Sequence, residues 1–206
     1  MTIWFATGNA HKKKELSAIL STELRIPSEV GVAFAPEETG SSFFENALIK
    51  AGELHKLLSG RHQDAWRQGD AIIADDSGIC VDALGGRPGI YSARYGGKLN
   101  DSERNALLLT ELGDNPSDKP LRNASFVCAM VLYYGPDRFF IAQETLEGEL
   151  VKNAEAARGS GGFGYDPILY LPELGRTVAE LSEEEKNRHS HRGKAGRAIA
   201  RILADH

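Results

Sequence analysis

The pattern of apolar residues changes along the chain, and this change limits the fold more than any other feature. Up to about residue 112, short apolar runs alternate with stretches of helical spacing, of which residues 42–60 are the clearest. Phe126 to Tyr134 and Phe139 to Glu147 are instead rich in β-formers, and the turn sequence Gly135-Pro136-Asp137-Arg138 separates them. This arrangement predicts an antiparallel hairpin. We therefore expect an α/β fold in which helices flank a mixed central sheet.

The same signals assign the other elements. We expect strands at residues 3–6, 30–34, 71–74, 79–83 and 168–171, and helices following residue 9, over 42–60 and 102–112, and in the tail after residue 192. Ser42 with Glu45, and Ser182 with Glu185, have the spacing of a helix capping box. Irregular structure is expected at 61–69, 85–89, 116–119 and 159–164, where polar residues, glycine or proline are frequent.

Composition favours one folded domain. The 206 residues are enough to bury a core, and no linker or repeat interrupts them, so we expect a single domain over residues 1–206. Hydrophobic residues make up 41% of the chain and charged residues 26%, which is too apolar for a disordered protein. No apolar run approaches the length needed to span a membrane, so no membrane partner is expected.

Charge and cysteine content argue against several classes of protein. The 24 basic and 29 acidic side chains give a net charge of −5, which repels a nucleic acid polymer but leaves a small phosphorylated ligand open. Cys80 and Cys128 stand far apart with no nearby metal-binding partner, so we expect reduced thiols. Residues 1–6 have no basic region before them, which argues against a signal peptide and favours a cytoplasmic location.

The segment from Thr7 to Lys12 follows the first predicted strand and opens a helix. Free backbone amides and the positive end of the helix dipole meet at such a turn, so it suits an anion such as phosphate. Thr7, Asn9 and Lys12 would line the site, with Lys12 reaching back over the phosphates. The alternative is an ordinary glycine-asparagine turn and helix cap.

Two acidic pairs suit a hard divalent metal ion. Asp75 and Asp76 directly follow the apolar run 71–74, which predicts charge at the end of a buried strand that a metal or a donor must compensate. The alternative for this pair is an Asx turn on the following amides. Glu37 and Glu38, taken alone, are more typical of exposed loop carboxylates.

A glycine-rich loop and a basic segment complete the candidate features. Residues 161–167 combine several amides with the rings of Phe163 and Tyr165, which could sandwich a base, although a turn with Phe163 in the core is also consistent. Lys186 and the sequence 189–192 gather cationic and hydrogen-bonding groups just before the last predicted helix, or else decorate the surface. No Ser-His-Asp order supports nucleophilic acyl chemistry.

Taken together, these blocks resemble the inosine triphosphate pyrophosphatase family, the RdgB and HAM1-like nucleotide hydrolases. The resemblance spans nearly the whole chain. It rests on Phe5-Ala6-Thr7-Gly8-Asn9 with Lys12, Glu37-Glu38-Thr39-Gly40, Glu45-Asn46-Ala47 with Lys50-Ala51, Ala74-Asp75-Asp76-Ser77-Gly78, Pro88 to Arg94, Gly161 to Pro167, and Ser190-His191-Arg192-Gly193. Two departures, the polar stretch 61–69 and His189, leave these motifs intact.

The resemblance implies a fold, a reaction and a set of site residues. The implied fold is a long mixed sheet in two lobes with a substrate cleft between them, usually in a homodimer. The implied reaction is magnesium-dependent cleavage of inosine, deoxyinosine and xanthosine triphosphates to the monophosphate and pyrophosphate. The resemblance places Mg²⁺ on Glu38 and Asp76 and makes Asp76 the proton acceptor. It places substrate on Thr7, Gly8, Asn9, Ala10, His11, Lys12, Lys50, Ser77, Phe163, Gly164, Tyr165, Asp166, Lys186, His191 and Arg192.

Some assignments stay open at this point. Asp75 should point away from Asp76 if the strand continues, which gives it a supporting role, but the two acids could exchange roles. For the base, we hypothesise that His191, Arg192 and backbone amides near Phe163 donate to a 6-keto oxygen, which leaves the rejection of guanine unexplained. A Maf-type pyrophosphatase for modified nucleotides and a non-catalytic nucleotide-sensing module are the alternative functions.

Overall fold

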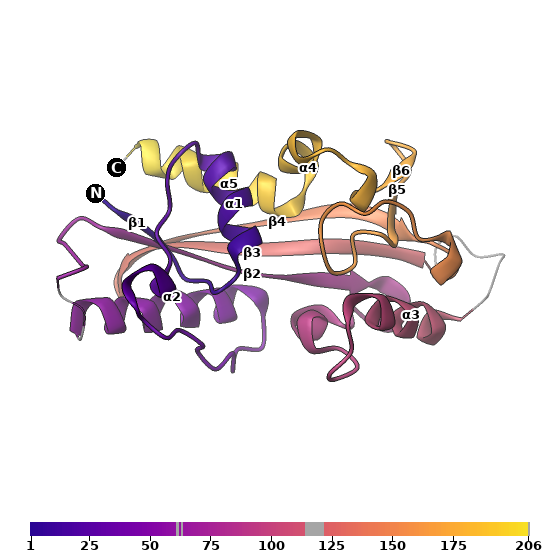
Figure 1. Cartoon of the computed structure of the whole chain (residues 1–206), viewed down its shortest axis with the longest axis horizontal. Helices are drawn as coiled ribbons and strands as arrows, with labels where there is room; N and C mark the ends of the chain where they lie inside the picture. The colour runs from indigo at the N-terminus through magenta and orange to yellow at the C-terminus, as the bar shows by residue number, and fades with distance from the viewer. Residues whose placement is uncertain (61, 63, 114–121, 206) are drawn as a thin grey trace. The chain divides into compact units, whose positions relative to one another are not determined.

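Six strands form a mixed sheet in the order β1-β2-β3-β4-β5-β6 in the part of the chain that the structure describes. The structure is a computed structural model that describes residues 1–60, 62, 64–113 and 122–205. The strands are β1 (Ile3–Phe5), β2 (Ala71–Val81), β3 (Asn123–Gly135), β4 (Arg138–Leu150), β5 (Leu169–Leu171) and β6 (Arg176–Thr177). β1 runs parallel to β2, whereas β4, β5 and β6 pair antiparallel, so the predicted mixed α/β sheet is confirmed (Figure 1).

The chain divides into two compact units. Unit 1 contains Met1–Asp76, Cys128–Glu144 and His191–His206, and unit 2 contains Ser77–Val127 and Thr145–Ser190. Strand β2 contributes to both, because the boundary falls between Asp76 and Ser77. Each unit has a hydrophobic core of its own. The expected single domain over residues 1–206 stays a prediction.

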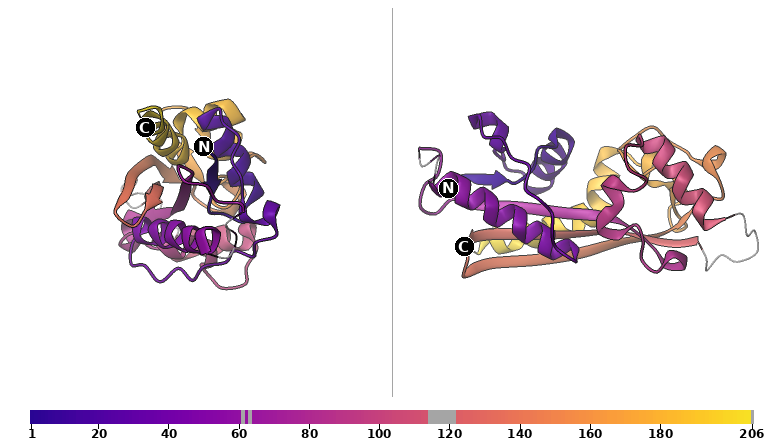
Figure 2. Two further views of the ribbon diagram at one scale, coloured as in Figure 1. Left: turned by 90° about the vertical axis from the view of Figure 1, so that its left-hand side faces the viewer. Right: turned by 90° about the horizontal axis from the view of Figure 1, so that it is seen from below.

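In unit 1, alternate residues of the strands pack into two hydrophobic cores. Phe5 and Ile73 pack on one face with α1 (Ala10–Leu20) and α5 (His191–Ala204), and Trp4 and Ile72 pack on the other with α2 (Phe43–Gly60). Figures 1 and 2 show these helices on opposite faces of the unit 1 strands. A side chain at Gly196 of α5 would lie 2.8 Å from Ile19 of α1, so a close approach of the two helices requires glycine there.

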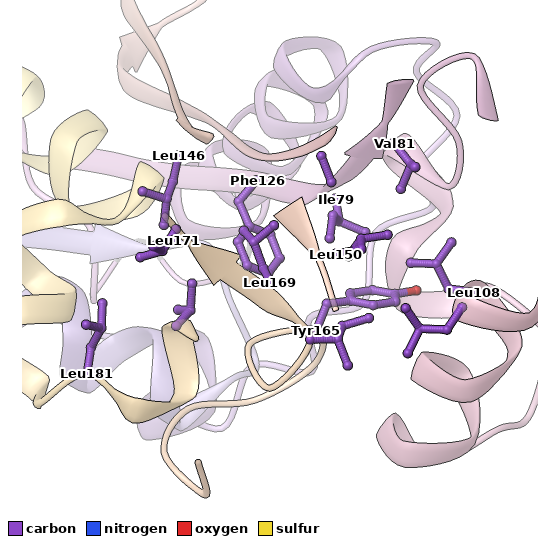
Figure 3. Packing of buried hydrophobic residues seen from close by; sticks show 14 residues of the cluster. Ile79, Val81, Leu108, Phe126, Leu146, Leu150, Tyr165, Leu169, Leu171 and Leu181 are labelled. Atoms are coloured by element: carbon purple, nitrogen blue, oxygen red, sulfur yellow. The ribbon is translucent and has the colours of Figure 1, made fainter. Parts of the chain in front are cut away.

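In unit 2, strand residues pack against α3 (Asp101–Leu112) and against Val178 and Leu181, which precede α4 (Glu183–His189). Ile79, Phe126, Leu146 and Leu169 belong to this core, and Figure 3 shows them together with the buried ring of Tyr165. Helix α3 contributes Leu108 and Leu109 to the same cluster. The remaining short helices are 3₁₀ turns: Pro27–Val30, Asp82–Leu84, Gly89–Arg94, Ala154–Ala156 and Val178–Glu180.

Several sequence expectations are confirmed. The predicted hairpin forms from β3 and β4, which are joined by a two-residue turn that suits only an antiparallel pair. Helix α2 covers 43–60, and Ser42 Oγ accepts from the Glu45 amide at 3.4 Å. The predicted capping box at Ser42 is only half formed, because the Glu45 carboxylate accepts from the Ser41 amide instead. Ser182 and Glu185 form the second capping box at the start of α4. The expected loop at 116–119 lies outside the described residues, as do two positions, 61 and 63, of the expected loop at 61–69.

Other expectations are wrong. The segments 71–74 and 79–83 are not separate strands, because β2 continues through Asp75 and Asp76. Residues 30–34 form no strand: Pro27 starts a 3₁₀ turn, and Gly31 ends it in the left-handed conformation at φ 71°. The last helix begins at His191, so His191 and Arg192 lie within α5 and not before it.

None of the helices in the described part of the chain is both long enough and apolar enough to cross a membrane.

Candidate active site

Asp75 is buried among cations in unit 1. Both of its carboxylate oxygens accept from Lys12 Nζ, at 3.1 and 3.0 Å, and Oδ2 also accepts from Arg192 Nε and Nη2 at 3.2 Å. Arg192 is equally buried, and its Nη1 donates to Glu15 Oε2 at 2.7 Å. Helices α1 and α5 therefore supply two cations to one carboxylate of β2, and a second carboxylate shares the arginine.

Asp76 lies on the opposite side of β2, as side chains alternate along a strand. Its Oδ1 accepts from Lys50 Nζ at 3.2 Å, and its Oδ2 accepts from Asn46 Nδ2 at 3.2 Å. Lys50 Nζ also donates to Glu38 Oε1 at 2.9 Å. One ammonium is thus shared by two carboxylates, and this group of Glu38, Lys50 and Asp76, called the acidic cluster below, carries an excess of negative charge.

The pKa values of the two neighbouring acids are shifted in opposite directions. Burial would raise the pKa of Asp75, but Lys12 and Arg192 outweigh burial and hold the pKa well below its usual range. Burial also raises the pKa of Asp76, and there Lys50 does not offset burial and the repulsion from Glu38, so the pKa lies above its usual value. For Lys50, attraction to Asp76, Asp75 and Glu38 outweighs burial and raises the pKa. The surroundings therefore stabilise the ionised form of Asp75 and destabilise the ionised form of Asp76.

These positions decide between the interpretations that the sequence left open. The Asx-turn reading of Asp75-Asp76 is wrong, because β2 continues past both residues. The expectation that Asp75 points away from Asp76 is confirmed by their separate partners. Glu37 is exposed, and Glu38 is the member of its pair that reaches the acidic cluster. The roles predicted for Glu38 and Asp76 as metal ligands, and for Asp76 as proton acceptor, stay predictions.

Asn46 is a site residue to which the sequence analysis gives no role, although it stands in one of the family motifs. It is fully buried on α2, and its side chain accepts from the Gly40 amide at 2.9 Å while donating to Asp76. A side chain at Gly40 would lie 2.7 Å from Asn46 Oδ1, so only glycine lets the loop that carries Glu38 close on α2. The available signal was a polar residue in the apolar stripe of Ala47, Ala51 and Leu54.

The segment from Thr7 to Lys12 forms the expected strand, turn and helix start. Asn9 caps α1 and accepts from the amides of His11 and Lys12 at 2.9 and 3.2 Å, and Thr7 Oγ1 accepts from the Asn9 amide at 3.1 Å. Gly8, Asn9, Ala10 and His11 are exposed. The cap and the proposed anion site thus use the same amides, and phosphate binding by this segment stays a prediction.

In unit 2, the glycine-rich loop is built around Asp166. Asp166 Oδ2 accepts from Lys186 Nζ at 2.8 Å and from the Phe163 amide at 2.9 Å. The Lys186 ammonium also lies 4.8 Å from the centre of the Phe163 ring, a cation–π contact. A side chain at Gly162 would lie 2.0 Å from Asp166 Oδ2, so the loop closes on the ion pair only with glycine there. The interpretation of Phe163 as a core residue is not supported, because it lines a cavity and lies outside the hydrophobic core cluster.

The remaining predicted residues have defined positions. Tyr165 is buried, and its hydroxyl donates to the carbonyl of Ser92 at 2.9 Å, so it packs as a support of the loop. Ser77 is half-buried in β2, and His191 is buried at the start of α5. The structure brings Lys12, Lys50, Glu38, Asp76 and Arg192 into unit 1 and Phe163, Asp166 and Lys186 into unit 2. Joint contact of both sets with one substrate stays a prediction.

Two cavities differ in their relation to these residues. One of about 650 Å³ in unit 1 is lined by residues near both chain ends, such as Met1 and Leu203, and none of the predicted site residues lines it. The other, of about 260 Å³ in unit 2, is lined by the glycine-rich loop, including Phe163, and by α3.

The acidic cluster offers a divalent metal two carboxylates, those of Glu38 and Asp76. Among the described residues, no three histidine, cysteine, aspartate or glutamate side chains gather closely enough to hold a metal by themselves. Glu38 and Asp76 nevertheless converge on one cation, the Lys50 ammonium. Mg²⁺ commonly takes one or two carboxylates and completes its shell with water and substrate phosphates, so the donor set is suitable.

The fold and the site define a class: an α/β protein in which a negatively charged pair of carboxylates lies beside a lysine and offers the oxygen donors that a hard cation prefers. The chain belongs to the Ham1 family, whose model matches residues 3–202. The family named from the sequence motifs is thereby confirmed.

Relatives cover the whole chain. It is 44% identical to a protein of Treponema denticola named dITP/XTP pyrophosphatase, over 98% of both chains, and 45% identical to a protein of the same name from Pectobacterium atrosepticum, over 96% of this chain and 95% of that one. Among solved structures, a HAM1 protein from Coxiella burnetii matches with a TM-score of 0.81 and 38% identity over 100% of both chains. The Ham1 protein of Staphylococcus aureus matches with a TM-score of 0.79 and 37% identity, over 100% of this chain and 99% of that one.

Proposed function

We propose that this chain hydrolyses nucleoside triphosphates between the α and β phosphates, releasing pyrophosphate and the monophosphate. The preferred substrates are the aberrant purine nucleotides dITP, ITP and XTP, which the reaction removes from the nucleotide pool. The relatives named dITP/XTP pyrophosphatase, 44–45% identical over nearly the whole chain, support this activity. The observation that carries the proposal is the acidic cluster, in which Glu38 and Asp76 converge on the ammonium of Lys50.

Magnesium is the cofactor in this proposal, and Glu38 and Asp76 would hold it. When bound, Mg²⁺ neutralises charge on the phosphates and so favours cleavage. The excess negative charge of the acidic cluster supports binding of a further cation there. Removal of magnesium with a chelator should abolish pyrophosphate release.

Asp76 accepts a proton from the water that attacks the α phosphorus. A carboxylate whose pKa is raised by burial and by Glu38 is more basic than an ordinary aspartate, which suits a general base. Asn46 fixes the carboxylate by donating to Oδ2, which leaves Oδ1 to Lys50. Asp75 lacks this basicity and serves to position cations.

Lys12 moves from Asp75 to the phosphates when substrate binds. Asp75 is held by two cations, so departure of Lys12 leaves it paired with Arg192. The lysine can therefore change partners without stranding a buried charge, which would be costly. Lys50 and Lys186 contribute further positive charge toward the phosphates.

Base recognition uses a 6-keto oxygen as acceptor. His191, Arg192 and amides near Phe163 are the proposed donors, and an adenine amino group cannot accept from them. Phe163, Gly164, Asp166 and Lys186 contact the nucleotide in this proposal. The Phe163 amide donates to Asp166, so it donates to the base only after a change of partner, and the Arg192 guanidinium also donates to Asp75 and Glu15.

The protein acts in the cytoplasm as a homodimer in this proposal. Sedimentation of the purified chain at micromolar concentration should give twice the 22.4 kDa mass of one chain. A monomer under those conditions would contradict the dimer and leave the reaction unaffected.

A substrate panel tests the reaction. Pyrophosphate release is measured with the triphosphates of inosine, xanthosine, guanosine, adenosine and the pyrimidines, with and without magnesium. Efficient release from inosine and xanthosine triphosphates is expected. Preference for a modified pyrimidine would favour a Maf-type activity, nucleotide binding without turnover would favour a sensor, and equal efficiency with ATP would contradict the recognition of a 6-keto oxygen.

A further inference from the structure

We propose that Asp101 and Asn105 of α3 are positioning residues that hold the glycine-rich loop in the conformation that binds the nucleotide base. They belong to none of the motifs that resemble the family. The inference rests on the proposed function only where the loop is said to meet the base. The contacts themselves lie entirely within unit 2.

Side chains of α3 form hydrogen bonds with both the amide and the carbonyl of Gly164. The Gly164 amide donates to Asp101 Oδ2 at 2.8 Å, and the Gly164 carbonyl accepts from Asn105 Nδ2 at 3.0 Å. Asp101 and Asn105 are four residues apart, so they lie on the same face of the helix one turn from each other. Arg104 donates to Asp101 Oδ1 at 2.7 Å and thereby orients the carboxylate toward the loop.

Gly164 is the residue of the loop where such a hold matters most. Its φ of +63° is left-handed, and glycine adopts this conformation without help from a side chain but also leaves it easily. Phe163 precedes it, and Tyr165 follows it with its own anchor on Ser92. Fixing the Gly164 peptide therefore sets the direction in which the Phe163 ring leaves the backbone.

Asn105 is poorly explained by the stability of α3 alone. Its side chain is 7% exposed, and no donor in the described part of the chain reaches its Oδ1. Burial of an amide with one group unpaired is unfavourable, and Leu108 and Leu109 show that an apolar residue suits this face of the helix. The hydrogen bond from Asn105 Nδ2 to the Gly164 carbonyl offsets this unfavourable burial. Asn105, Gly164 and Phe163 also line the same cavity of about 260 Å³.

The experiment compares Asp101→Ala, Asp101→Asn and Asn105→Ala in the full chain. Loss of either hydrogen bond should raise the KM for inosine triphosphate about fivefold and leave kcat within about twofold, because the loop meets the base and not the reacting phosphate. Asp101→Asn should give a KM between those of the wild type and Asp101→Ala, since its one amide oxygen can accept from Gly164 but can no longer be oriented by Arg104 at the same time.

Glu103→Ala is the matched control. Glu103 caps the same helix by accepting from the Asn100 amide at 2.9 Å and makes no contact with the loop in the described structure. This variant should lower the stability of α3 with no change in KM. An unchanged KM in both Asp101→Ala and Asn105→Ala, or an equal rise in Glu103→Ala, would overturn the proposal.

Hydrogen exchange separates this inference from the proposed function. The Gly164 amide should be protected in the wild type, should exchange about tenfold faster in Asp101→Ala, and should exchange at an intermediate rate in Asp101→Asn. Exchange is measured without substrate. A wild type that releases no pyrophosphate would contradict the proposed function, and the exchange rates would still show whether Asp101 fixes Gly164. Equal exchange in all variants would overturn the inference.

Discussion

Asp75 and Asp76 are adjacent in one strand, yet the charge around them differs. Asp75 accepts from two cations, Lys12 and Arg192, whereas Asp76 shares the cation Lys50 with Glu38. The first carboxylate is stabilised as an anion and the second is not, as their opposite pKa shifts express. The negative charge of Asp75, on one side of β2, is thus compensated, whereas Asp76, on the other side, still attracts a cation or a proton. The predictions below test this division.

The largest expected effect is on catalysis by Asp76→Asn. Turnover of inosine triphosphate should fall about 10³-fold, because the amide can neither accept the proton nor hold a metal ion well. The free energy of unfolding in urea should not fall, since a neutral group replaces a strained buried charge. Turnover near the wild-type level, or loss of folding, would end the division of roles.

Arg192→Met should show the opposite behaviour in stability. It leaves Asp75 and Glu15 without the buried guanidinium, and breaking a buried ion pair typically costs about 3–5 kcal/mol of the free energy of unfolding. Urea unfolding followed by circular dichroism measures the loss. Arg201→Met is the control, because Arg201 is exposed on the same helix and its loss should cost less than about 0.5 kcal/mol. Equal losses in both variants would contradict the assigned role of Arg192.

A smaller effect is expected at Cys128, which is buried near Asp75 in unit 1. Burial raises the pKa of the thiol to about 12, so the folded protein binds this proton more tightly than the unfolded chain does. The contribution is complete below about pH 9, the usual value, and stability should fall as the pH rises from about 9 to 12. Cys128→Ala should flatten this part of the pH dependence of the unfolding free energy. An identical decline in the variant would show that other groups cause it.

The fold was largely predictable because its signals are local. The helical spacing of residues 43–60, the capping box at Ser182 and Glu185 and the turn between β3 and β4 each depend on neighbouring residues. The errors arose where distant residues decide. Two adjacent acids argue against a strand, yet β2 continues through them because Lys12, Lys50 and Arg192 supply the missing charge. Arg192 and Asp75 are separated by 117 positions, and a single sequence does not show such a pairing.

The candidate site was predictable as a set of motifs but not as a set of contacts. The resemblance selected Glu38 and Asp76, and the structure places both on Lys50. It did not show that Asn46 links Asp76 to the Gly40 loop, or that α3 holds Gly164. These residues act through hydrogen bonds between elements, for which residue type and spacing give only a weak signal.

The binding of Mn²⁺, used as a paramagnetic substitute for Mg²⁺, tests the central claim most directly. Its affinity is measured by electron paramagnetic resonance in the presence of a non-hydrolysable α,β-methylene inosine triphosphate, for the wild type, Glu38→Gln and Glu37→Gln. We expect Glu38→Gln to weaken binding at least about tenfold, since it removes one of the two converging carboxylates, and Glu37→Gln, a change at an exposed neighbour, to leave it unaltered. Equal affinities in all three proteins would contradict the assignment of the cation to the acidic cluster.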